Sequence, residues 1–582
     1  MVLCPEGALF FRLKKSGPRS YLQIVENRRD GRAVRQHVIA TIGRIDELAA
    51  RGGLATLLAS GARLCEQVML FSALENPEQS TRLSCKRIGG PLLFGRLWER
   101  LGVGAVLQEL LAPRAFEFAL ERAVFVATLH RLFVSGSDRD CASWMQDYAI
   151  PGTGSLSLHH FYRAMAWLGE ELPEERQDHA TPFSPRTIKD EIEEALFARQ
   201  RDLFSDLSVV FMDTTSLSFE GEGGDTLGAH GYSKDHRPDL KQMILAVVVD
   251  GEGRPICTEM MPGNTADVSV LVPVIDRLRQ RFGITRACVV ADRGMISEAT
   301  IAALDERGLE YVLGVRERTD GRVRTVLDDA RPFTPLLIER ARGETQLFVK
   351  EVRVEGIRYI AARNEAEAEK DAADRAAIIA ALDQQLKRGD KALIGNSAYR
   401  RYLRATAKKA FAIDIGKVAE EARYDGLFVL RTNARITPLQ AVLRYRELLT
   451  VEALFRAAKA SFDTRPVFHS SDAAIRGHVF CSFRALLLQK ELFESCADAS
   501  LKPEWAELLR DLDRLQEATV ESGGKTWAVR TEATGAIPAL MKFAGITLPA
   551  RVRATSPPPV AAAPQQTSPK RRGRPRRSAT RA

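Results

Sequence analysis

Between residues 207 and 315 the chain switches repeatedly between two hydrophobic periodicities, and this pattern constrains the fold more than any other feature. Apolar residues recur at every second position in stretches such as LSVVFMDTTSLSFEG, which indicates strands. They recur at helical spacing in stretches such as DVSVLVPVIDRLRQRFG, and Asp250-Gly251 marks a hairpin turn. The predicted order β-β-β-α-β-α-β is typical of a mixed α/β fold with a central sheet flanked by helices.

The flanking sequence is organised differently. Residues 8–46 alternate as short strands around two turn signals, which predicts a small β meander. Residues 320–436 combine further strands with an Ala- and charge-rich helix, and this stretch is too long to be a loop. The predicted domains are a small β module (1–58), a helical region (59–200), the first part of the core (201–319), an inserted β-rich subdomain (320–436), the second part of the core (437–500), a C-terminal helix and strand segment (501–550) and a disordered basic tail (551–582).

The positive charge of the chain is concentrated at one end. Of the 84 Lys and Arg residues, nine lie in residues 551–582, which contain none of the 75 Asp and Glu residues. Residues 1–550 therefore carry 75 residues of each sign and are electrically balanced. A polyanion would have to bind that part of the chain through local patches.

Targeting features and cysteine motifs are missing from the sequence. The first residues contain no long apolar segment of a secretory signal, and no apolar run is long enough to span a membrane. The eight cysteines are scattered, without a Cys-x-x-Cys motif, which argues against a zinc module and fits a reducing compartment. We therefore expect a cytoplasmic protein with no membrane partner.

Two aspartates follow apolar runs in the α/β segment. Asp213 follows SVVFM and Asp292 follows ACVVA. A strand that ends in Asp places a carboxylate at the edge of the sheet where open α/β sheets bind ligands. Each Asp by itself is equally explained by a turn or a helix cap, with Ser297 as the N-cap of the next helix.

A third carboxylate, Glu452, lies on the predicted helix YRELLTVEALFRAAK at the edge of its apolar stripe. The simplest explanation is an ion pair with Arg456, one turn later. The alternative is that Glu452 joins Asp213 and Asp292 in one site. Three converging carboxylates would raise one another's pKa, and Mg²⁺ ions, which prefer oxygen ligands, would relieve the repulsion. Two such ions can support in-line displacement at a phosphodiester.

The helix also resembles a known signature. Tyr445, Glu452 and Lys459, spaced seven and seven, are similar to the Tyr, Glu and Lys of the insertion-sequence four superfamily of bacterial DDE transposases. GYSKDHRPDLKQ, PGNTADVSVL, VADRGMIS, YDGLFVLRTN and RPVFH also look like segments of these transposases, and the resemblance covers most of residues 8–550. The family's Arg four residues before the Glu is replaced by Leu448. Arg444, Arg446 and Arg456 are nearby substitutes.

The resemblance implies an RNase H-like catalytic core interrupted by a β-rich insertion. It implies that Asp213, Asp292 and Glu452 are catalytic and bind two Mg²⁺ ions, with Mn²⁺ as a substitute. The implied partners are double-stranded DNA, as terminal inverted repeats and as target, and a second copy of the chain in a synaptic dimer. Residues 59–200 would then bind the DNA ends or mediate dimerisation, and the protein would be nucleoid-associated in a bacterial cytoplasm. The implied reaction is cleavage at the element's ends and joining of the 3′ hydroxyl to target DNA. The residues expected to contact DNA are Tyr445, Lys459, Arg456, Lys234, Arg237, Arg572 and Arg574.

These DNA contacts have simpler alternatives. Lys234 and Arg237 lie in a loop that could equally be solvated, and Lys459 could be a surface lysine. Arg572 and Arg574 belong to KRRGRPRR, which resembles an AT-hook but could be a generic basic tail. Two other functions stay open: a non-catalytic, transposon-derived DNA-binding protein, and a metal-dependent, structure-specific nuclease that cuts without joining.

Overall fold

The chain, seen as a computed structural model, divides into two compact units. One unit comprises residues 1–89, 510–537 and 547–582, and the other comprises residues 90–509 and 538–546. Apart from three isolated positions, the structure describes residues 9–30, 33–50, 82–134, 136–178, 184–200, 209–234, 236–284, 287–315, 320–340, 343–388, 397–405, 411–461, 467–522 and 525–555.

The first unit contains two antiparallel sheets. One is the predicted meander, in the order β1 (Leu9–Ser16), β2 (Arg19–Asp30) and β3 (Ala33–Arg44), followed by the short helix α1 (Ile45–Ala50). The other has the spatial order β18 (Val552–Thr555), β17 (Lys525–Arg530), β16 (Gln516–Ser522) and β4 (Arg82–Arg87).

This second sheet corrects two predictions. β4 lies inside residues 59–200, which were predicted to be helical, and β18 lies inside residues 551–582, which were predicted to be disordered from their first residue. Both strands are short and are the outer strands of the described sheet, where β4 pairs with β16 and β18 pairs with β17. Segments this short show little periodicity of their own, because they become strands only when a distant partner supplies the hydrogen bonds.

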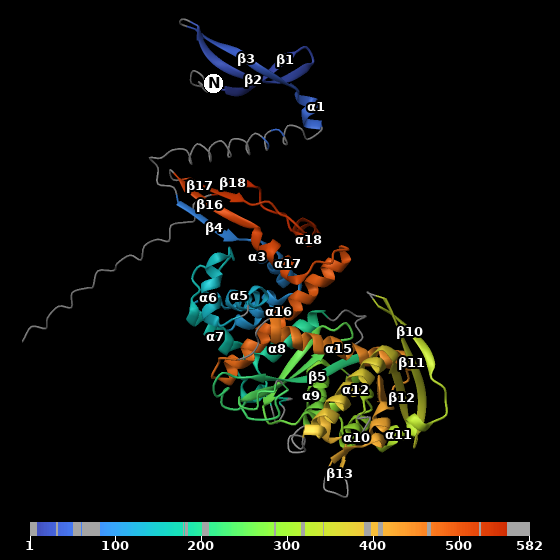
Figure 1. Cartoon of the computed structure of the whole chain (residues 1–582). Coiled ribbons are helices and arrows are strands. Elements are labelled where there is room, and N and C mark those ends of the chain that lie inside the picture. Colours follow the sequence, from blue (N-terminus) through green and yellow to red (C-terminus); the bar gives the residue numbers. More distant parts are fainter. Residues whose placement is uncertain are drawn as a thin grey trace, which may run out of the picture. The chain divides into compact units, whose positions relative to one another are not determined.

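The second unit is built around a mixed sheet of nine strands (Figure 1). β5, β8 and β9 run parallel, and the other neighbours pair antiparallel. In spatial order the strands are β10 (Thr334–Arg340), β11 (Gly343–Val354), β12 (Ile357–Asn364), β15 (Leu427–Thr432), β9 (Glu310–Gly314), β8 (Cys288–Ala291), β5 (Val209–Ser218), β6 (Gln242–Val249) and β7 (Pro255–Pro262).

Helices cover the two faces of the central strands. α9 (Asp267–Phe282) and α10 (Glu298–Glu306) share a buried apolar cluster with one face of β5, β6 and β8. α15 (Pro438–Ser461) packs against β5, β8 and β9 from the other face (Figure 1). The predicted order of strands and helices between residues 207 and 315 is therefore confirmed, and Ser297 caps α10 by accepting a hydrogen bond from the Thr300 backbone N–H, as predicted.

Most strands within residues 320–436 belong to the central sheet, whereas the two short strands Leu403–Ala405 and Phe411–Ile413 pair in a separate two-stranded sheet. β10, β11 and β12 continue the central sheet through β15, which pairs with β9. The remaining elements of this stretch are α11 (Gly321–Asp328), α12 (Glu365–Arg388), α13 (Ser397–Arg400), β13 (Leu403–Ala405), β14 (Phe411–Ile413) and α14 (Ile415–Ala422).

The remaining helices precede or follow the central sheet in the chain. They are α3 (Gly89–Arg100), α4 (Val103–Leu111), α5 (Leu120–Phe133), α6 (Asp138–Trp144), α7 (Leu158–Leu168), α8 (Ile188–Gln200), α16 (Asp472–Asp498), α17 (Trp505–Arg514) and α18 (Ile537–Phe543). Helices from the two groups pack together, because α16 packs against α5 and α7 as well as α15.

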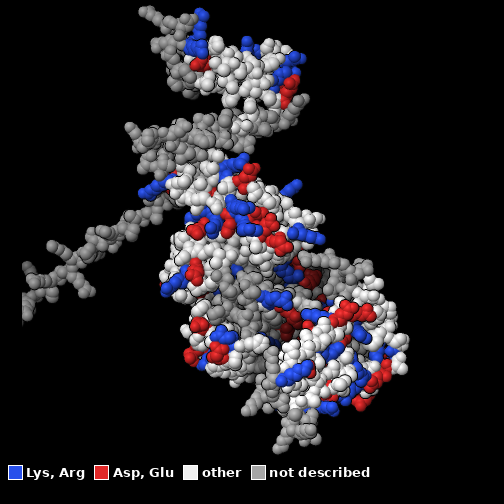
Figure 2. Space-filling view, viewed as in Figure 1, with Lys and Arg blue, Asp and Glu red and all other residues white. Residues whose placement is uncertain are grey.

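On the face shown in Figure 2, Lys and Arg are interspersed with Asp and Glu, in keeping with the balanced charge.

A buried group of charges joins α8 to β7 and α9, and we call it the ion-pair network. Lys189 Nζ lies 2.9 Å from Asp190 Oδ1 and 3.0 Å from Glu193 Oε2. Arg277 Nη2 lies 2.8 Å from Asp190 Oδ2. All of these side chains are almost fully buried, and each charge has a partner of opposite sign. The members of the network are Lys189, Asp190, Glu193, Glu259, Arg277 and Arg281.

Candidate active site

Asp213 and Asp292 lie on neighbouring strands where the parallel pairing of these strands stops. β5 continues through Asp213 to Ser218 and pairs with β6 over this length, as the strand predicted for LSVVFMDTTSLSFEG requires, so the expected position of Asp213 at a strand end is wrong. What ends there is the pairing of β5 with β8, whose last pair is Met212 with Ala291. Each aspartate is the next residue after that pair. Because neighbouring strands lie about 4.8 Å apart, the two carboxylates leave the sheet side by side.

The alternation of side chains places both aspartates on the face covered by α15. Met212 and Ala291, one residue earlier on each strand, belong to the apolar cluster under α9 and α10. Successive side chains on a strand point to opposite faces. Asp213 and Asp292 therefore point towards α15.

α15 brings a tyrosine and a glutamate to the same place. Tyr445 and Glu452 are seven residues apart and share one stripe of the helix. Tyr445 Oη donates a hydrogen bond to Asp292 Oδ1 at 3.0 Å, and its ring stacks on Phe428 with centroids 5.9 Å apart. Gly314, at the end of β9, leaves space for the phenol, because a Cβ at that position would overlap Tyr445 Oη.

A cavity of about 200 Å³ lies among these elements. The three carboxylates reach it from β5, from the residue after β8 and from α15. The residues that line it are Asp213, Asp292, Asn364, Glu367, Phe428, Tyr445, Arg446, Leu448, Leu449 and Glu452.

The side chain of Glu452 is exposed and lines this cavity. In the part of the chain that the structure describes, no ion pair joins it to Arg456. The ion-pair explanation of this carboxylate therefore has no support among the described contacts.

Acidic side chains outnumber basic ones in the lining of the cavity. Burial, together with the negative charges of Asp292 and Glu452, raises the pKa of the Asp213 carboxyl to about 6. The charge of Lys234 and a hydrogen bond from the Thr214 backbone N–H to Asp213 Oδ1, 2.7 Å long, act in the opposite direction on that pKa. A cation in the cavity would remove the repulsion that raises the pKa.

The donor atoms suit a hard divalent cation. Carboxylate oxygens are the ligands that Mg²⁺ prefers. Among the described residues, however, no three His, Cys, Asp or Glu side chains lie close enough together to hold one ion. Mg²⁺ is commonly held by one or two carboxylates plus substrate phosphate. The residues therefore fit an ion whose coordination the substrate completes, rather than a preformed cage of three carboxylates.

Two family models match the chain. One, described as "Transposase DDE domain", matches residues 204–488 and includes all three carboxylates. The other, described as "IS1634 family transposase, N-terminal domain", matches residues 11–76 and includes the meander. The chain belongs to the DDE insertion-sequence transposases. This confirms the family predicted from the sequence, and no curated protein matches the chain.

The loop of the transposase that precedes β6 was predicted to contact phosphate through Lys234 and Arg237. Lys234 Nζ donates hydrogen bonds to Thr214 O and Thr214 Oγ1 within the protein, at 2.8 Å each. Arg237 is exposed and forms an ion pair with Asp239 at 2.8 Å. The two side chains therefore have different surroundings, although a phosphate contact was predicted for both.

Of the three arginines considered as substitutes for the signature Arg, only Arg446 lines the cavity. Its Nη1 atom is buried and has no hydrogen-bond partner among the described residues. Arg444 lies near Cys288. Burial raises the pKa of the Cys288 thiol to about 11, and Arg444 acts in the opposite direction on that pKa. Arg456 is exposed on α15. The side chain of Lys459 and the residues Arg572 and Arg574 lie outside the described part of the transposase.

Sequence reasoning missed several residues around the carboxylates. Asn364 and Glu367 line the cavity from the end of β12 and the start of α12, more than 60 residues from the nearest site residue in the sequence. Asn364 is buried, and its Oδ1 accepts a hydrogen bond from the Ala366 backbone N–H at 3.1 Å. Asp267, the first residue of α9, lies behind Asp213 and accepts a hydrogen bond from Thr214 Oγ1 at 2.9 Å. No local sequence pattern distinguishes these residues from ordinary caps.

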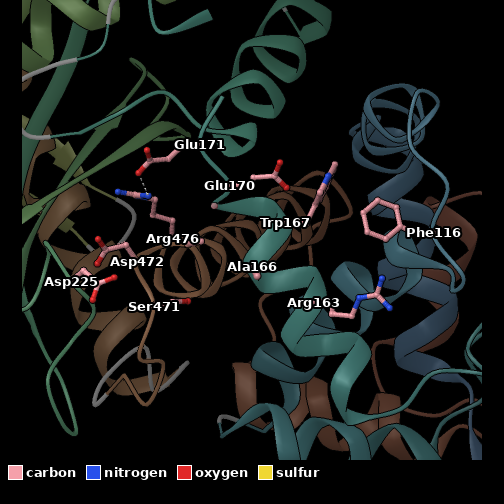
Figure 3. A pocket seen from close by; sticks show the side chains of 12 residues that line it. Phe116, Arg163, Ala166, Trp167, Glu170, Glu171, Asp225, Ser471, Asp472 and Arg476 are labelled. Atoms are coloured by element: carbon pink, nitrogen blue, oxygen red, sulfur yellow. Dashed lines mark hydrogen bonds and ion pairs between the residues drawn. The ribbon is translucent and has the colours of Figure 1, made fainter. Parts of the chain in front are cut away.

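The transposase has a roomier pocket, of about 570 Å³, at a different place (Figure 3). Arg163, Trp167 and Arg476 line it together with several acids, from α7, α16 and the loops beside them. Several of its charges already have partners: Arg476 Nη1 lies 3.2 Å from Glu171 Oε1, and Glu170 is bound by Arg114 at 2.7 Å. Asp213, Asp292 and Glu452 do not line it, so the smaller cavity is the better candidate for the chemistry.

Among the helices that the structure describes, none is both long and apolar enough to cross a bilayer.

Proposed function

We propose that this transposase cuts DNA at the ends of an insertion sequence and joins the resulting 3′ hydroxyl to target DNA, with Asp213, Asp292 and Glu452 as its catalytic carboxylates. The observation that carries the proposal is the shared cavity, which these three residues line from three separate elements. The order and direction of β5 to β9, with α15 on one face, support an RNase H-like core. Residues 320–436 would then be an insertion between the second and third carboxylates.

The roles of the individual side chains follow from their contacts. Asp213, Asp292 and Glu452 would hold two Mg²⁺ ions, or Mn²⁺ in their place. When bound, these ions supply activation of the attacking oxygen and stabilisation of the leaving oxygen. Tyr445 donates to Asp292 Oδ1 and so fixes the orientation of this carboxylate, which leaves Oδ2 for binding. The Thr214 backbone N–H does the same for Asp213 through Oδ1.

The reaction needs no covalent protein intermediate. Attack of water on phosphorus breaks the bond to the 3′ oxygen and frees a 3′ hydroxyl. That hydroxyl then attacks a phosphodiester of the target and displaces its 3′ oxygen. Both steps are in-line displacements at phosphorus, so one arrangement of carboxylates serves both.

The DNA contacts form a second part of the proposal. Arg446 is the best substitute for the missing signature Arg, because it lines the cavity and its buried Nη1 lacks a hydrogen-bond partner among the described residues. A guanidinium that faces carboxylates suits a bound phosphate between them. Lys459, Arg456 and Arg237 would contact the DNA backbone. Arg572 and Arg574 would tether A·T-rich DNA from the tail, and a synaptic dimer would hold two ends.

The test uses the purified full chain with duplex DNA taken from the flanks of its own gene. In Mg²⁺ we expect nicks at the element's ends and joined products. In Ca²⁺ we expect binding with little cleavage, and in EDTA no cleavage. Asp292→Asn should bind the DNA without cutting it. Full activity in EDTA would overturn the proposal, cleavage without joining would indicate a nuclease, and binding without cleavage in Mg²⁺ would indicate a non-catalytic DNA-binding protein.

A further inference from the structure

On the face of the sheet opposite Asp213, three polar side chains are joined by hydrogen bonds and an ion pair. Lys234 Nζ lies 2.8 Å from Thr214 O, 2.8 Å from Thr214 Oγ1 and 3.1 Å from Asp267 Oδ2. Thr214 Oγ1 donates a hydrogen bond to Asp267 Oδ1 at 2.9 Å. We call Lys234, Thr214 and Asp267 the Lys234 cluster.

The ammonium of Lys234 has no donor left for an external partner. An ammonium group carries three N–H donors, and its three acceptors are all within the cluster. The backbone N–H of Lys234 is also bound, because it donates to Ser216 Oγ at 3.0 Å. A phosphate contact, which the loop sequence had suggested, would require this arrangement to break.

The cluster acts on Asp213 through the backbone of β5. Asp213 and Thr214 are successive residues of a strand, so their side chains leave on opposite faces. Thr214 points to the α9 side, where it is held by Lys234 and Asp267. Its backbone N–H donates to Asp213 Oδ1 at 2.7 Å. Holding Thr214 on one face therefore fixes the carboxylate on the other face.

Asp267 also lies near the second catalytic aspartate. A Cβ built on Gly294 would lie 3.9 Å from both Asp267 Oδ2 and Asp292 Oδ2. Without a cation of its own, Asp267 would add a fourth negative charge beside three others. The ion pair with Lys234 offsets this charge, so the cluster can contribute orientation without adding repulsion.

We propose that Lys234, Thr214 and Asp267 are positioning residues that fix Asp213 for metal binding, and that Lys234 is not a phosphate contact. The proposal rests on the role given to Asp213 under the proposed function. Residues that orient metal ligands commonly change metal affinity by about 10–100-fold when they are replaced. The side chains of Lys234 and Asp267 are 28% and 25% exposed, and partly exposed ion pairs contribute little to stability. A change in metal affinity without a change in stability is therefore the expected signature.

The experiment compares two matched substitutions of one residue. Thr214→Val removes the hydroxyl and keeps the shape, whereas Thr214→Ser keeps the hydroxyl. Binding of Mn²⁺ to the full chain is followed by electron paramagnetic resonance. We expect Thr214→Val and Lys234→Met to weaken Mn²⁺ binding at least about tenfold, and Thr214→Ser to stay within about twofold of the unmodified chain. Thermal unfolding in EDTA should be nearly the same for all four proteins.

A second measurement separates positioning from phosphate contact. Affinity for end DNA is measured in EDTA over a range of salt concentrations. We expect Lys234→Met to leave both the affinity and the salt slope unchanged. If Lys234→Met instead lowers the affinity and reduces the slope by about one, while Mn²⁺ binding stays normal, Lys234 is a phosphate contact. Equal Mn²⁺ affinities for Thr214→Val and Thr214→Ser would also overturn the positioning role.

Asp213→Asn distinguishes failure of this inference from failure of the proposed function. If Asp213→Asn loses Mn²⁺ binding but the variants of the Lys234 cluster do not, only the positioning role fails. If Asp213→Asn binds Mn²⁺ as tightly as the unmodified chain, Asp213 is not a metal ligand. The function proposed for the cavity then fails together with the inference.

Discussion

Two groups of acids in the same unit have opposite electrostatic surroundings. In the ion-pair network each carboxylate contacts Lys or Arg directly, as Asp190 does with Lys189 and Arg277. In the cavity the carboxylates of Asp213, Asp292 and Glu452 line one space together with Glu367, and Arg446 is the basic residue among the lining side chains. The first group is completed by the chain's own cations, whereas in the second the acids outnumber the cations.

The pKa directions show the difference. Burial by itself would raise the pKa of Asp190, but the charges of Lys189, Arg281 and Arg277 outweigh it and hold the pKa below its usual value. At Asp213 burial dominates, and the neighbouring acids add to it, so the pKa rises to about 6. A buried acid with an internal partner contributes to holding the fold together, whereas one without such a partner is available for a cation from outside.

The largest expected effect tests the cavity. Glu452→Gln keeps the shape of the side chain and removes its charge. Because metal positioning supplies several kcal/mol of transition-state stabilisation, cleavage of end DNA should fall by about a thousandfold or more, while DNA affinity survives. Glu447→Gln makes the same change on the same helix outside the cavity and should cut normally. Normal cutting by Glu452→Gln would remove Glu452 from the site.

The next effect tests the ion-pair network. Asp190→Asn leaves Lys189, Arg277 and Arg281 buried without one of their acids. Removing one partner of a buried pair costs about 3–5 kcal/mol, so the free energy of unfolding, measured with denaturant, should fall by that amount. Asp239→Asn breaks an exposed pair with Arg237 and should stay within about 0.5 kcal/mol. If Asp190→Asn lowers the free energy of unfolding no more than Asp239→Asn does, the network does not hold the helices to the sheet.

The same substitution at Asp213 should act in the opposite direction. The folded-state pKa of about 6 lies above the ordinary value of 3.8, so the native state favours the protonated acid. The associated stabilisation is fully present below about pH 4 and is lost as the pH rises through 6. In EDTA at pH 7, Asp213→Asn should therefore raise the free energy of unfolding, by up to about 3 kcal/mol.

Measuring the same pair of proteins at pH 4 provides the control for this prediction. There the unmodified Asp213 is already protonated in the native state, so Asn should bring little gain. A loss of stability in the Asp213→Asn variant at pH 7 would contradict the view that this acid lacks sufficient internal partners.

The smallest expected effect tests the packing of Tyr445 against Gly314 beside the cavity. Gly314→Ala places a Cβ on Tyr445 Oη, so the tyrosine must move and its hydrogen bond to Asp292 must loosen. Such overpacking costs about 1–3 kcal/mol, and we expect cleavage to fall by about tenfold. Gly321→Ala is the matched control, because a Cβ there meets open space. Equal cleavage by the two variants would show that Tyr445 does not position Asp292.

Much of the catalytic segment could be predicted from local pattern. The order of elements from β5 to β9 follows from hydrophobic periodicity, and the helix that carries Tyr445 and Glu452 follows from its apolar stripe. The family, which the comparisons confirm, was predicted from short motifs. These features lie in continuous stretches, so neighbouring residues provide enough information to recognise them.

Features that depend on distant partners could not be predicted in this way. β4 pairs with β16, more than 400 residues later, and β18 pairs only with β17. The extension of the central sheet by β10, β11 and β12 depends on the pairing of β15 with β9. Pairing across such distances leaves no periodic trace in the strands themselves, and short strands are especially dependent on it.

The sequence by itself determined which residue types this protein has for its chemistry, and which helices and strands carry Asp213, Asp292 and Glu452. Only the tertiary structure decided their surroundings. The end of the parallel pairing after Met212 and Ala291 sets the two aspartates side by side, and the packing of α15 brings Tyr445 to Asp292. On the opposite face, the loop before β6 and the start of α9 bring Lys234 and Asp267 to Thr214. Periodicity is a property of neighbours in the chain, whereas burial and charge pairing depend on neighbours in space.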